Sequence, residues 1–236
     1  MPKTLRIENG RSGSATIVAE VLVDQTNAQE TLPFDGGARK KCFDLVVATI
    51  GLLLLLPLFG LVAIAIRLDS RGPILFHQVR YGRDRRAFRI VKFRTMTLAS
   101  ETDQHDVARR ESTQVTRVGR FLRRTHIDEL PQLWNVLRGE MSIVGPRPHS
   151  KPLSERFEQQ IPAYFQRYRV APGLTGWAQA NGLWGKIDTL AQMRMRVEHD
   201  LYYVENISLR FDIRIILMTL VAVSRGDFRR RHAIGA

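Results

Sequence analysis

Several residue patterns that mark common enzyme classes are missing from this chain of 236 residues. Its single cysteine, Cys42, excludes an internal disulfide framework and fits a reducing compartment. No set of His and Cys residues has the spacing of a zinc site. The Walker glycine–lysine motif and the G-x-S-x-G elbow are absent as well. These absences argue against zinc-binding domains, P-loop nucleotide hydrolases and serine hydrolases of the elbow type.

The N-terminal stretch, residues 1–37, lacks the apolar core and the small-residue cleavage site of a signal peptide. It also lacks a sustained hydrophobic period, so we predict a flexible cytosolic leader. Internal repeats and low-complexity blocks are not found anywhere in the sequence.

Much of the apolar content lies in one uncharged run, Leu45 to Ile66, which is long enough to cross a bilayer. Pro57 lies in its middle and predicts a kink. Basic residues flank both ends, with Arg39-Lys40-Lys41 before the run and Arg67 and Arg71 after it. Because Lys and Arg favour the cytoplasmic side, we expect the helix to break at Pro57 and return as a re-entrant hairpin. A tilted, ordinary span is the alternative.

The formal net charge of +13 suits nucleic acid, an anionic membrane surface or phosphate-bearing substrates. The uncharged run counts against nucleic acid. Residues 118–124 are basic and amphipathic, and residues 207–223 are apolar-rich with three charges near their start, which indicates helices lying in the membrane interface. Segment 88–96 alternates apolar and basic residues and leaves strand or short helix undecided. The fold class expected is mostly α with little β.

Two adjacent carboxylates, Asp128 and Glu129, precede a short segment with helical apolar spacing. Pro131 is tolerated only in a first turn, so a helix is expected to begin near Asp128, with its positive dipole end favouring the ionised carboxylate. The alternative is structural: Asp is a favoured N-cap, and Thr125-x-x-Asp128 resembles a capping box. His126 alternates away from Asp128 in an extended approach and is left out of the site.

An acidic pair among many cations, next to a membrane segment, suits phosphoryl transfer, in which cations neutralise phosphate while a nucleophile attacks in line. The membrane segment indicates that one substrate is a lipid. Arg147 stands between two prolines that stiffen its backbone, which favours bidentate phosphate binding, although a plain rigid turn has the same sequence.

The run from Asp128 to Pro148 resembles the core of the bacterial sugar transferase family, the monotopic polyprenyl-phosphate hexose-1-phosphate transferases. The resemblance covers nearly everything from Lys40 to about Ser224. It includes Lys41-Cys42-Phe43-Asp44, Lys92-Phe93-Arg94-Thr95-Met96, Pro172-Gly173-Leu174-Thr175-Gly176 and Asp200-Leu201-Tyr202-Tyr203.

The resemblance implies transfer of sugar-1-phosphate from a UDP-sugar to undecaprenyl phosphate, with release of UMP. It implies that Asp128 is the nucleophile, forming an aspartyl phosphosugar intermediate, and that Glu129 is its partner carboxylate, both tied to Mg²⁺. The residues implied to bind substrate are Lys92, Arg94, Arg123, Arg147 and Asp200. It also implies a re-entrant membrane helix broken at a Ser-Pro pair.

This chain departs from the family pattern at two positions. Leu56 stands where Ser usually precedes the helix-breaking proline, which removes one hydrogen bond from the break. Ala171 stands where members commonly carry a cation before Pro-Gly, so that either another residue such as Arg169 compensates or substrate affinity differs. The segment from Trp177 to Gly185 is similar to members that transfer glucose-1-phosphate in exopolysaccharide synthesis, and galactose-type relatives are close to it.

Together these inferences divide the chain into a leader (1–37), a membrane-embedded re-entrant helix (38–68), a cytosolic catalytic domain on the membrane surface (69–226) and a basic tail (227–236). The expected location is the cytoplasmic face of the bacterial inner membrane, with anionic lipids as partners and no nucleic acid. A homodimer stays open. A non-catalytic, basic membrane-surface scaffold is the competing interpretation, and it leaves the Asp128–Glu129 pair unexplained.

Overall fold

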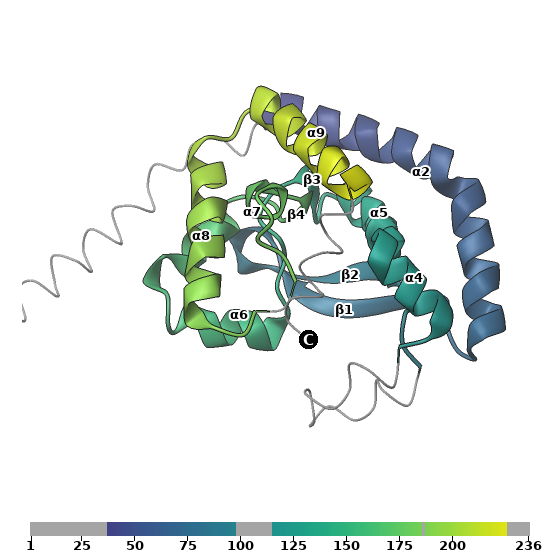
Figure 1. Cartoon of the computed structure of the whole chain (residues 1–236). Helices are drawn as coiled ribbons and strands as arrows, with labels where there is room; N and C mark the ends of the chain where they lie inside the picture. The colour runs from purple at the N-terminus through teal and green to yellow at the C-terminus, as the bar shows by residue number, and fades with distance from the viewer. Residues whose placement is uncertain (1–36, 98–114, 186, 226–236) are drawn as a thin grey trace, which may run out of the picture. The chain divides into compact units, whose positions relative to one another are not determined.

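The structure is a computed structural model that describes residues 37–97, 115–185 and 187–225 (Figure 1). These residues belong to one compact unit that is mostly helical with little strand, as the sequence predicts. The predicted basic tail and all of the predicted leader except Gly37 lie outside the described residues.

The apolar run forms helix α2 (Gly37–Asp69), which keeps its helical conformation through Pro57. Figure 1 shows the axis of α2 turning about midway, and a proline that removes one backbone donor accounts for a bend there. The break expected at Pro57 is thus a bend within one helix. In the described part of the chain, α2 is the one helix long and apolar enough to cross a membrane, and only 11% of its most apolar stretch is buried.

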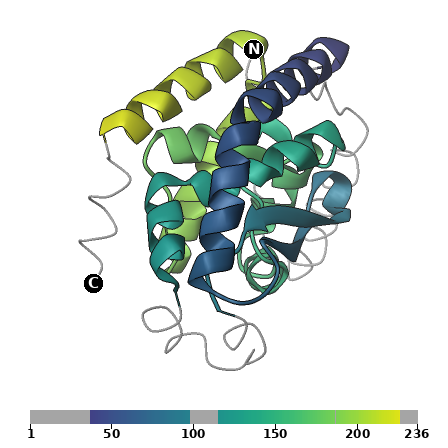
Figure 2. The same ribbon diagram turned by 90° about the vertical axis from the view of Figure 1, so that its right-hand side faces the viewer.

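Both ends of α2 are attached to the rest of the unit, and Figure 2 shows the helix passing across one face of it. Near its start, Lys40 Nζ donates to the Val144 carbonyl at 3.2 Å and pairs with Asp212 at 2.7 Å. Near its end, Ile66 packs in one apolar cluster with Leu122 of helix α4 (Arg117–Thr125). The middle of the helix also packs on the unit through one face, with Leu52, Leu55, Leu58 and Phe59, while Leu53, Leu54, Leu56 and Leu61 stay exposed.

Strand β1 (Leu75–Tyr81) pairs antiparallel with β2 (Ala87–Phe93), and a short 3-10 turn, η1 (Arg83–Arg85), joins them. The segment that the sequence left undecided is therefore a strand. Its alternation explains the choice, because Phe88 and Ile90 point into the core while Arg89 between them is exposed.

A second pair of short strands, β3 (Ser142–Val144) and β4 (Gly173–Thr175), runs parallel. The two backbone segments approach so closely that a Cβ on Gly173 would lie 2.1 Å from the Gly145 nitrogen. Only glycine fits there. Because β3 leads directly into Gly145 and Arg147, this close pairing fixes the chain that delivers the Arg147 side chain.

The remaining helices lie C-terminal to β3. They begin with α6 (Lys151–Glu158) and the 3-10 helix η3 (Pro162–Arg169). They are followed by α7 (Trp177–Ala180), α8 (Leu190–Glu205) and α9 (Leu209–Arg225). A capping box of Thr189 and Gln192 starts α8, since each side chain bonds the other residue's backbone nitrogen.

A buried amide connects β2 to the helix that follows the acidic pair. Asn135, fully buried in α5 (Leu133–Leu137), accepts a hydrogen bond from the Val91 nitrogen at 2.9 Å and donates to the Arg89 carbonyl at 2.8 Å. It thus satisfies two backbone groups that would otherwise be buried without partners. This side chain, together with the pairing of β2 with β1, holds the strand beside the carboxylates.

The buried Lys40–Asp212 pair gives the first prediction. Lys40→Met leaves Asp212, which is 0% exposed, without its cation, so we expect the free energy of unfolding to fall by about 3 to 5 kcal/mol in denaturant titrations in detergent micelles. The matched change at the exposed neighbour, Arg39→Met, should alter it by less than about 0.5 kcal/mol. Equal stability of the two variants would contradict the assignment.

Candidate active site

The acidic pair lies in the first turn of a 3-10 helix, η2 (Ile127–Gln132), which runs into α5. A helix begins next to Asp128, as predicted. The capping-box alternative is wrong, because the Thr125 hydroxyl donates to the carbonyls of Phe121 and Leu122 and so belongs to the last turn of α4. His126 has a left-handed backbone (φ 56°) that links α4 to η2, rather than the extended conformation expected.

Glu129 forms the central ion pairs of the site. Its Oε1 lies 2.9 Å from Lys92 Nζ on β2, and both terminal nitrogens of Arg147 bond its two oxygens, one of them at 2.8 Å. Such two-point pairing is the strong geometry for a guanidinium and a carboxylate. One side chain thereby joins β2, η2 and the loop after β3.

The two neighbouring carboxyls have opposite pKa shifts. Burial opposes ionisation of Glu129, but the charges and hydrogen bonds of Arg147 and Lys92 outweigh it and hold its pKa well below the usual range. For Asp128, burial and the adjacent Glu129 charge raise the pKa to about 6, against the lowering effect of Lys92, Arg123 and Arg147. The net shift at Asp128 is therefore opposite to the one expected from a helix dipole alone, because burial and Glu129 outweigh the influences that favour ionisation.

This arrangement gives Asp128 the properties of a nucleophile that is ionised at neutral pH. A carboxylate with a pKa of about 6 is mostly charged at pH 7 and is more basic than an ordinary aspartate. Glu129, in contrast, stays ionised and paired. The separation of the two pKa values follows from the environments and assigns the two residues different tasks.

Not all of the residues predicted to bind substrate lie near Asp128. Arg123, whose Nε donates to Thr95 Oγ1 at 2.9 Å, lies close enough to lower the pKa of Asp128. Arg94, from the same motif as Lys92, points elsewhere and donates to the carbonyl and hydroxyl of Ser70 at the end of α2. The structure thus brings Lys92, Arg123, Glu129 and Arg147 around Asp128 and places Arg94 apart from them.

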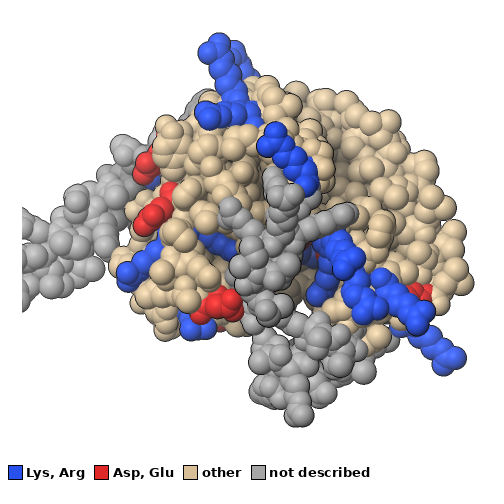
Figure 3. All heavy atoms as spheres, viewed as in Figure 1, with Lys and Arg blue, Asp and Glu red and all other residues tan. Residues whose placement is uncertain are grey.

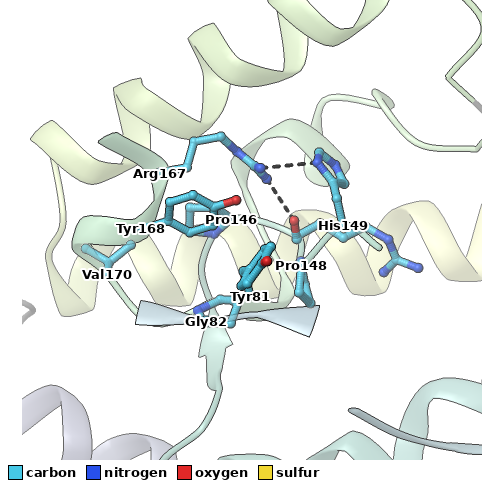
Figure 4. A pocket seen from close by; sticks show the side chains of 10 residues that line it. Tyr81, Gly82, Pro146, Pro148, His149, Arg167, Tyr168 and Val170 are labelled. Atoms are coloured by element: carbon cyan, nitrogen blue, oxygen red, sulfur yellow. Dashed lines mark hydrogen bonds between the residues drawn. The ribbon is translucent and has the colours of Figure 1, made fainter. Parts of the chain in front are cut away.

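Asp200 also lies outside the immediate site, but it supports it. Asp200 accepts from Arg167 Nε at 2.7 Å, and another nitrogen of Arg167 donates to the Arg147 carbonyl at 2.7 Å. Figure 4 shows the Arg167 guanidinium reaching both this carbonyl and the ring of His149. Compensation for Ala171 by Arg169 or another residue stays a prediction, since Arg167 of the same segment is buried and engaged by Asp200 and the Arg147 carbonyl.

Behind the Arg147 loop lies a small cavity, lined on one side by Tyr81 and Tyr168 and on the other by Arg167 and His149 (Figure 4). Its volume of about 10 Å³ is room for a single water. Neither Asp128 nor Glu129 lines it. The cavity is therefore a packing void under the loop, too small to hold a substrate.

Four buried or half-buried basic residues around the loop escaped the sequence interpretation: Arg80, His149, Arg167 and Arg196. Burial and the surrounding arginines hold the pKa of His149 well below its usual range, so this ring is neutral. Burial, together with the positive charge of Arg147, lowers the pKa of Arg80 to about 10. The signal in the sequence was weak, because these residues lie in different segments and belong to no recognisable motif.

The metal role predicted for the acidic pair fits these contacts only in part. Among residues 37–97, 115–185 and 187–225, no three His, Cys, Asp or Glu side chains are arranged to hold a metal ion. Both oxygens of Glu129 are occupied by Lys92 and Arg147, so Glu129 does not fit as a ligand while these pairs stand. Asp128 remains, and Mg²⁺ commonly needs only one or two carboxylates when substrate phosphates complete its shell.

The described residues thus combine a carboxylate pair set among cations with one helix that is long and apolar enough to cross a membrane. Comparison with known sequences gives the family. The chain belongs to the bacterial sugar transferase family, whose model matches residues 36–226.

Three curated relatives show the range of the similarity. The chain is 47% identical over 181 residues to a UDP-glucose:undecaprenyl-phosphate glucose-1-phosphate transferase of Escherichia coli, an alignment that covers 77% of this chain and 39% of the relative. It is 44% identical over 196 residues to the exopolysaccharide production protein PSS of Rhizobium leguminosarum, covering 79% and 96%. It is 41% identical over 187 residues to a UDP-N-acetylgalactosamine-undecaprenyl-phosphate N-acetylgalactosaminephosphotransferase of Aeromonas hydrophila, covering 79% and 44%. The chain therefore spans less than half the length of two of these relatives.

The opposed pKa shifts give the second prediction. In Glu129→Gln the negative charge beside Asp128 is lost and Lys92 and Arg147 lose their partner, so the pKa of Asp128 should fall below its value of about 6. Carbon-13 NMR of the Asp128 carboxyl across a pH titration of metal-free protein measures this.

The matched control for this titration is Glu155→Gln on α6. Glu155 bonds Tyr81 and is not among the charges that shift Asp128, so this variant should leave the titration of Asp128 unchanged. An unchanged or higher pKa of Asp128 in Glu129→Gln would show that Glu129 is not the charge that raises it.

Proposed function

We propose that this chain transfers a hexose-1-phosphate from a UDP-sugar to undecaprenyl phosphate, releasing UMP. The observation that carries the proposal is the paired geometry of Asp128 and Glu129. One carboxylate is held ionised by two cations, and the other has a pKa of about 6 and lies among those same cations. Relatives named for this reaction support it.

The proposed reaction has two displacements at one phosphorus atom. First, an Asp128 carboxylate oxygen attacks the β-phosphorus of the UDP-sugar, the bond from that phosphorus to the bridging oxygen breaks, and UMP leaves with the electron pair. The product is an aspartyl phosphosugar. A phosphate oxygen of undecaprenyl phosphate then attacks the same phosphorus, which regenerates the Asp128 carboxylate and gives undecaprenyl-diphospho-sugar. Each step exchanges one oxygen–phosphorus bond for another, so no redox partner is needed.

In this mechanism Glu129 acts mainly by holding Lys92 and Arg147 where charge develops. Its low pKa makes it a poor proton donor, and both its oxygens are engaged by cations. Fixed cations aimed at a transferring phosphoryl group stabilise the transition state without reorganisation. Arg123, exposed beside Asp128, is available to the incoming phosphate of the lipid.

We also propose Mg²⁺ as cofactor, held by Asp128 together with the phosphates of the donor. Bound there, the ion would neutralise phosphate charge and help the departure of UMP. The sugar is proposed to be glucose and the role the initiating step of exopolysaccharide synthesis, because the glucose-1-phosphate transferase and the exopolysaccharide protein are among the relatives. Because another relative is named for N-acetylgalactosamine, this sugar is the alternative donor to test.

The membrane arrangement we propose is monotopic, at the cytoplasmic face of the bacterial inner membrane. Lys40 near the start of α2 and Ile66 near its end both pack on the same unit, so one straight crossing would put one attachment on the wrong side. The exposed leucines between them enter the bilayer instead: Leu53, Leu54, Leu56 and Leu61.

Two further elements favour an interfacial position. The large apolar residues of α9 that are exposed are Ile213, Leu217, Leu220, Val221 and Val223. In Figure 3 the surface along α2 is bare of charge, and Lys and Arg side chains gather beside it in the region of α4, where Arg117, Arg120 and Arg124 are exposed. Apolar faces bordered by cations suit an anionic lipid surface. The scaffold alternative would explain these faces but not the opposed pKa values of the acidic pair.

The third prediction tests the nucleophile. Asp128→Asn should abolish UMP release from UDP-glucose by purified protein with undecaprenyl phosphate and Mg²⁺, because the amide cannot form the intermediate, while the protein stays in the membrane fraction. Asp84→Asn, an exposed change in η1 whose left-handed backbone suits asparagine, is the matched control and should keep full turnover. Undiminished turnover in Asp128→Asn would sink the assignment.

The fourth prediction tests the re-entrant arrangement. In a Cys42→Ser background, single cysteines are placed at two exposed positions, Ala38 in the first turn of α2 and Pro73 just after its end. Both should resist a membrane-impermeant maleimide in intact cells and react once the membrane is opened. Labelling of either position from outside would show that α2 crosses the bilayer.

A further inference from the structure

The loop between α7 and α8 brings an aromatic side chain to the start of the acidic segment. The indole of Trp184 lies against the imidazole of His126, with ring centroids 5.1 Å apart and an interplanar angle of 43°. His126 is the left-handed residue that turns the chain from α4 into η2, two residues before Asp128. Trp184 therefore lies beside the segment that carries the proposed nucleophile.

The backbone of this loop is built to present Trp184. Gly182 (φ 79°) and Gly185 (φ 89°) bracket it, and both have the left-handed conformation that other residues avoid. The Leu183 nitrogen donates to the Ala178 carbonyl of α7 at 2.9 Å. The loop thus turns tightly at two points and is fixed to α7 at one end.

The other end of the loop is fixed to the basic cluster around Arg147. Arg196 of α8, 7% exposed, donates to the Gly185 carbonyl at 3.0 Å. Burial and then the positive charge of Arg147 lower the pKa of Arg196 to about 10, which places the two guanidinium groups near each other. The loop therefore reaches the Asp128 segment through Trp184 and the Arg147 cluster through Gly185.

We propose that Trp184, backed by His126, forms the wall against which the hexose of the donor stacks, and that it determines which sugar is accepted. The inference rests on the proposed function. The hexose is bonded directly to the phosphorus that Asp128 attacks, whereas the uridine lies one phosphate further away. A side chain next to the Asp128 segment therefore meets the sugar before it meets the base.

An indole suits this task for a chemical reason. A hexopyranose presents C–H bonds on its ring faces, and the negative face of an aromatic ring attracts these weakly positive hydrogens while both surfaces leave water. Glucose has its ring hydroxyls equatorial, so its faces are apolar. Galactose has an axial hydroxyl at C4, which makes one ring face polar and leaves the opposite face apolar. We assign Trp184 to the face that would carry this hydroxyl, so that the wall accepts glucose and disfavours galactose.

The test compares donors with and without a sugar on purified full-length protein. Binding of UDP-glucose, UDP-galactose and UMP is measured by calorimetry, and kcat/KM by UMP release, for wild type, Trp184→Leu and Trp184→Phe. Trp184→Leu should weaken UDP-glucose binding about three- to tenfold, the range of a lost aromatic contact, and leave UMP binding unchanged. Trp184→Phe should retain most of the affinity, and the preference for UDP-glucose over UDP-galactose should shrink in Trp184→Leu.

Trp134→Leu, the same change at an exposed position on α5, is the matched control and should leave both affinities unchanged. Equal weakening of UMP and UDP-glucose by Trp184→Leu would overturn the assignment to the sugar, and so would unchanged binding of both. Wild-type protein that binds UDP-glucose but releases no UMP would refute the proposed function. The binding data would then still test whether Trp184 contacts the sugar.

Discussion

The three-way ion pair of Glu129 with Lys92 and Arg147 is the interaction on which the site depends. It joins a strand, a 3-10 helix and a loop that are separated in sequence, and it does so in a largely buried place. Removing either cation would leave Glu129 partly uncompensated, which buried charges tolerate poorly. Because both oxygens of Glu129 bond these cations, Lys92 and Arg147 hold fixed positions. Asp128 beside them is then the carboxylate that the proposed function uses as nucleophile.

The electrostatics of the pair also explain why two adjacent acids need not share one role. Glu129 has direct ion pairs and ionises easily, and its negative charge then raises the pKa of the adjacent Asp128. Cations outnumber acids around the pair, because Arg123 and Arg147 act on Asp128 and Arg80 acts on Glu129. A diphosphate substrate would enter this positively charged place. The positive surplus that the sequence shows as a net charge of +13 is thus concentrated, in part, where phosphate is expected.

Local patterns in the sequence predicted the helices, the apolar run and the start of a helix near Asp128, because each depends on neighbouring residues. Pairings across the fold could not be predicted without the resemblance. Lys92 and Arg94 stand two residues apart in one motif, yet one bonds Glu129 and the other bonds Ser70. Thr125 looked like a cap for the acidic helix and instead bonds backward into α4. In both cases the deciding partner comes from the tertiary arrangement, on which local spacing carries no information.

The attachment of α2 bears on the site through one short strand. The Val144 carbonyl accepts hydrogen bonds from Lys40 on α2 and from the Tyr203 hydroxyl on α8, and Asp212 on α9 pairs with both donors. Three residues after Val144 comes Arg147, whose own carbonyl is held by Arg167. Buried networks of this kind have few alternative arrangements, since each donor and acceptor is already satisfied. The position of the apolar helix α2 and that of Arg147 are therefore fixed by the same strand, so that the proposed membrane seating of α2 would also orient the site relative to the lipid surface.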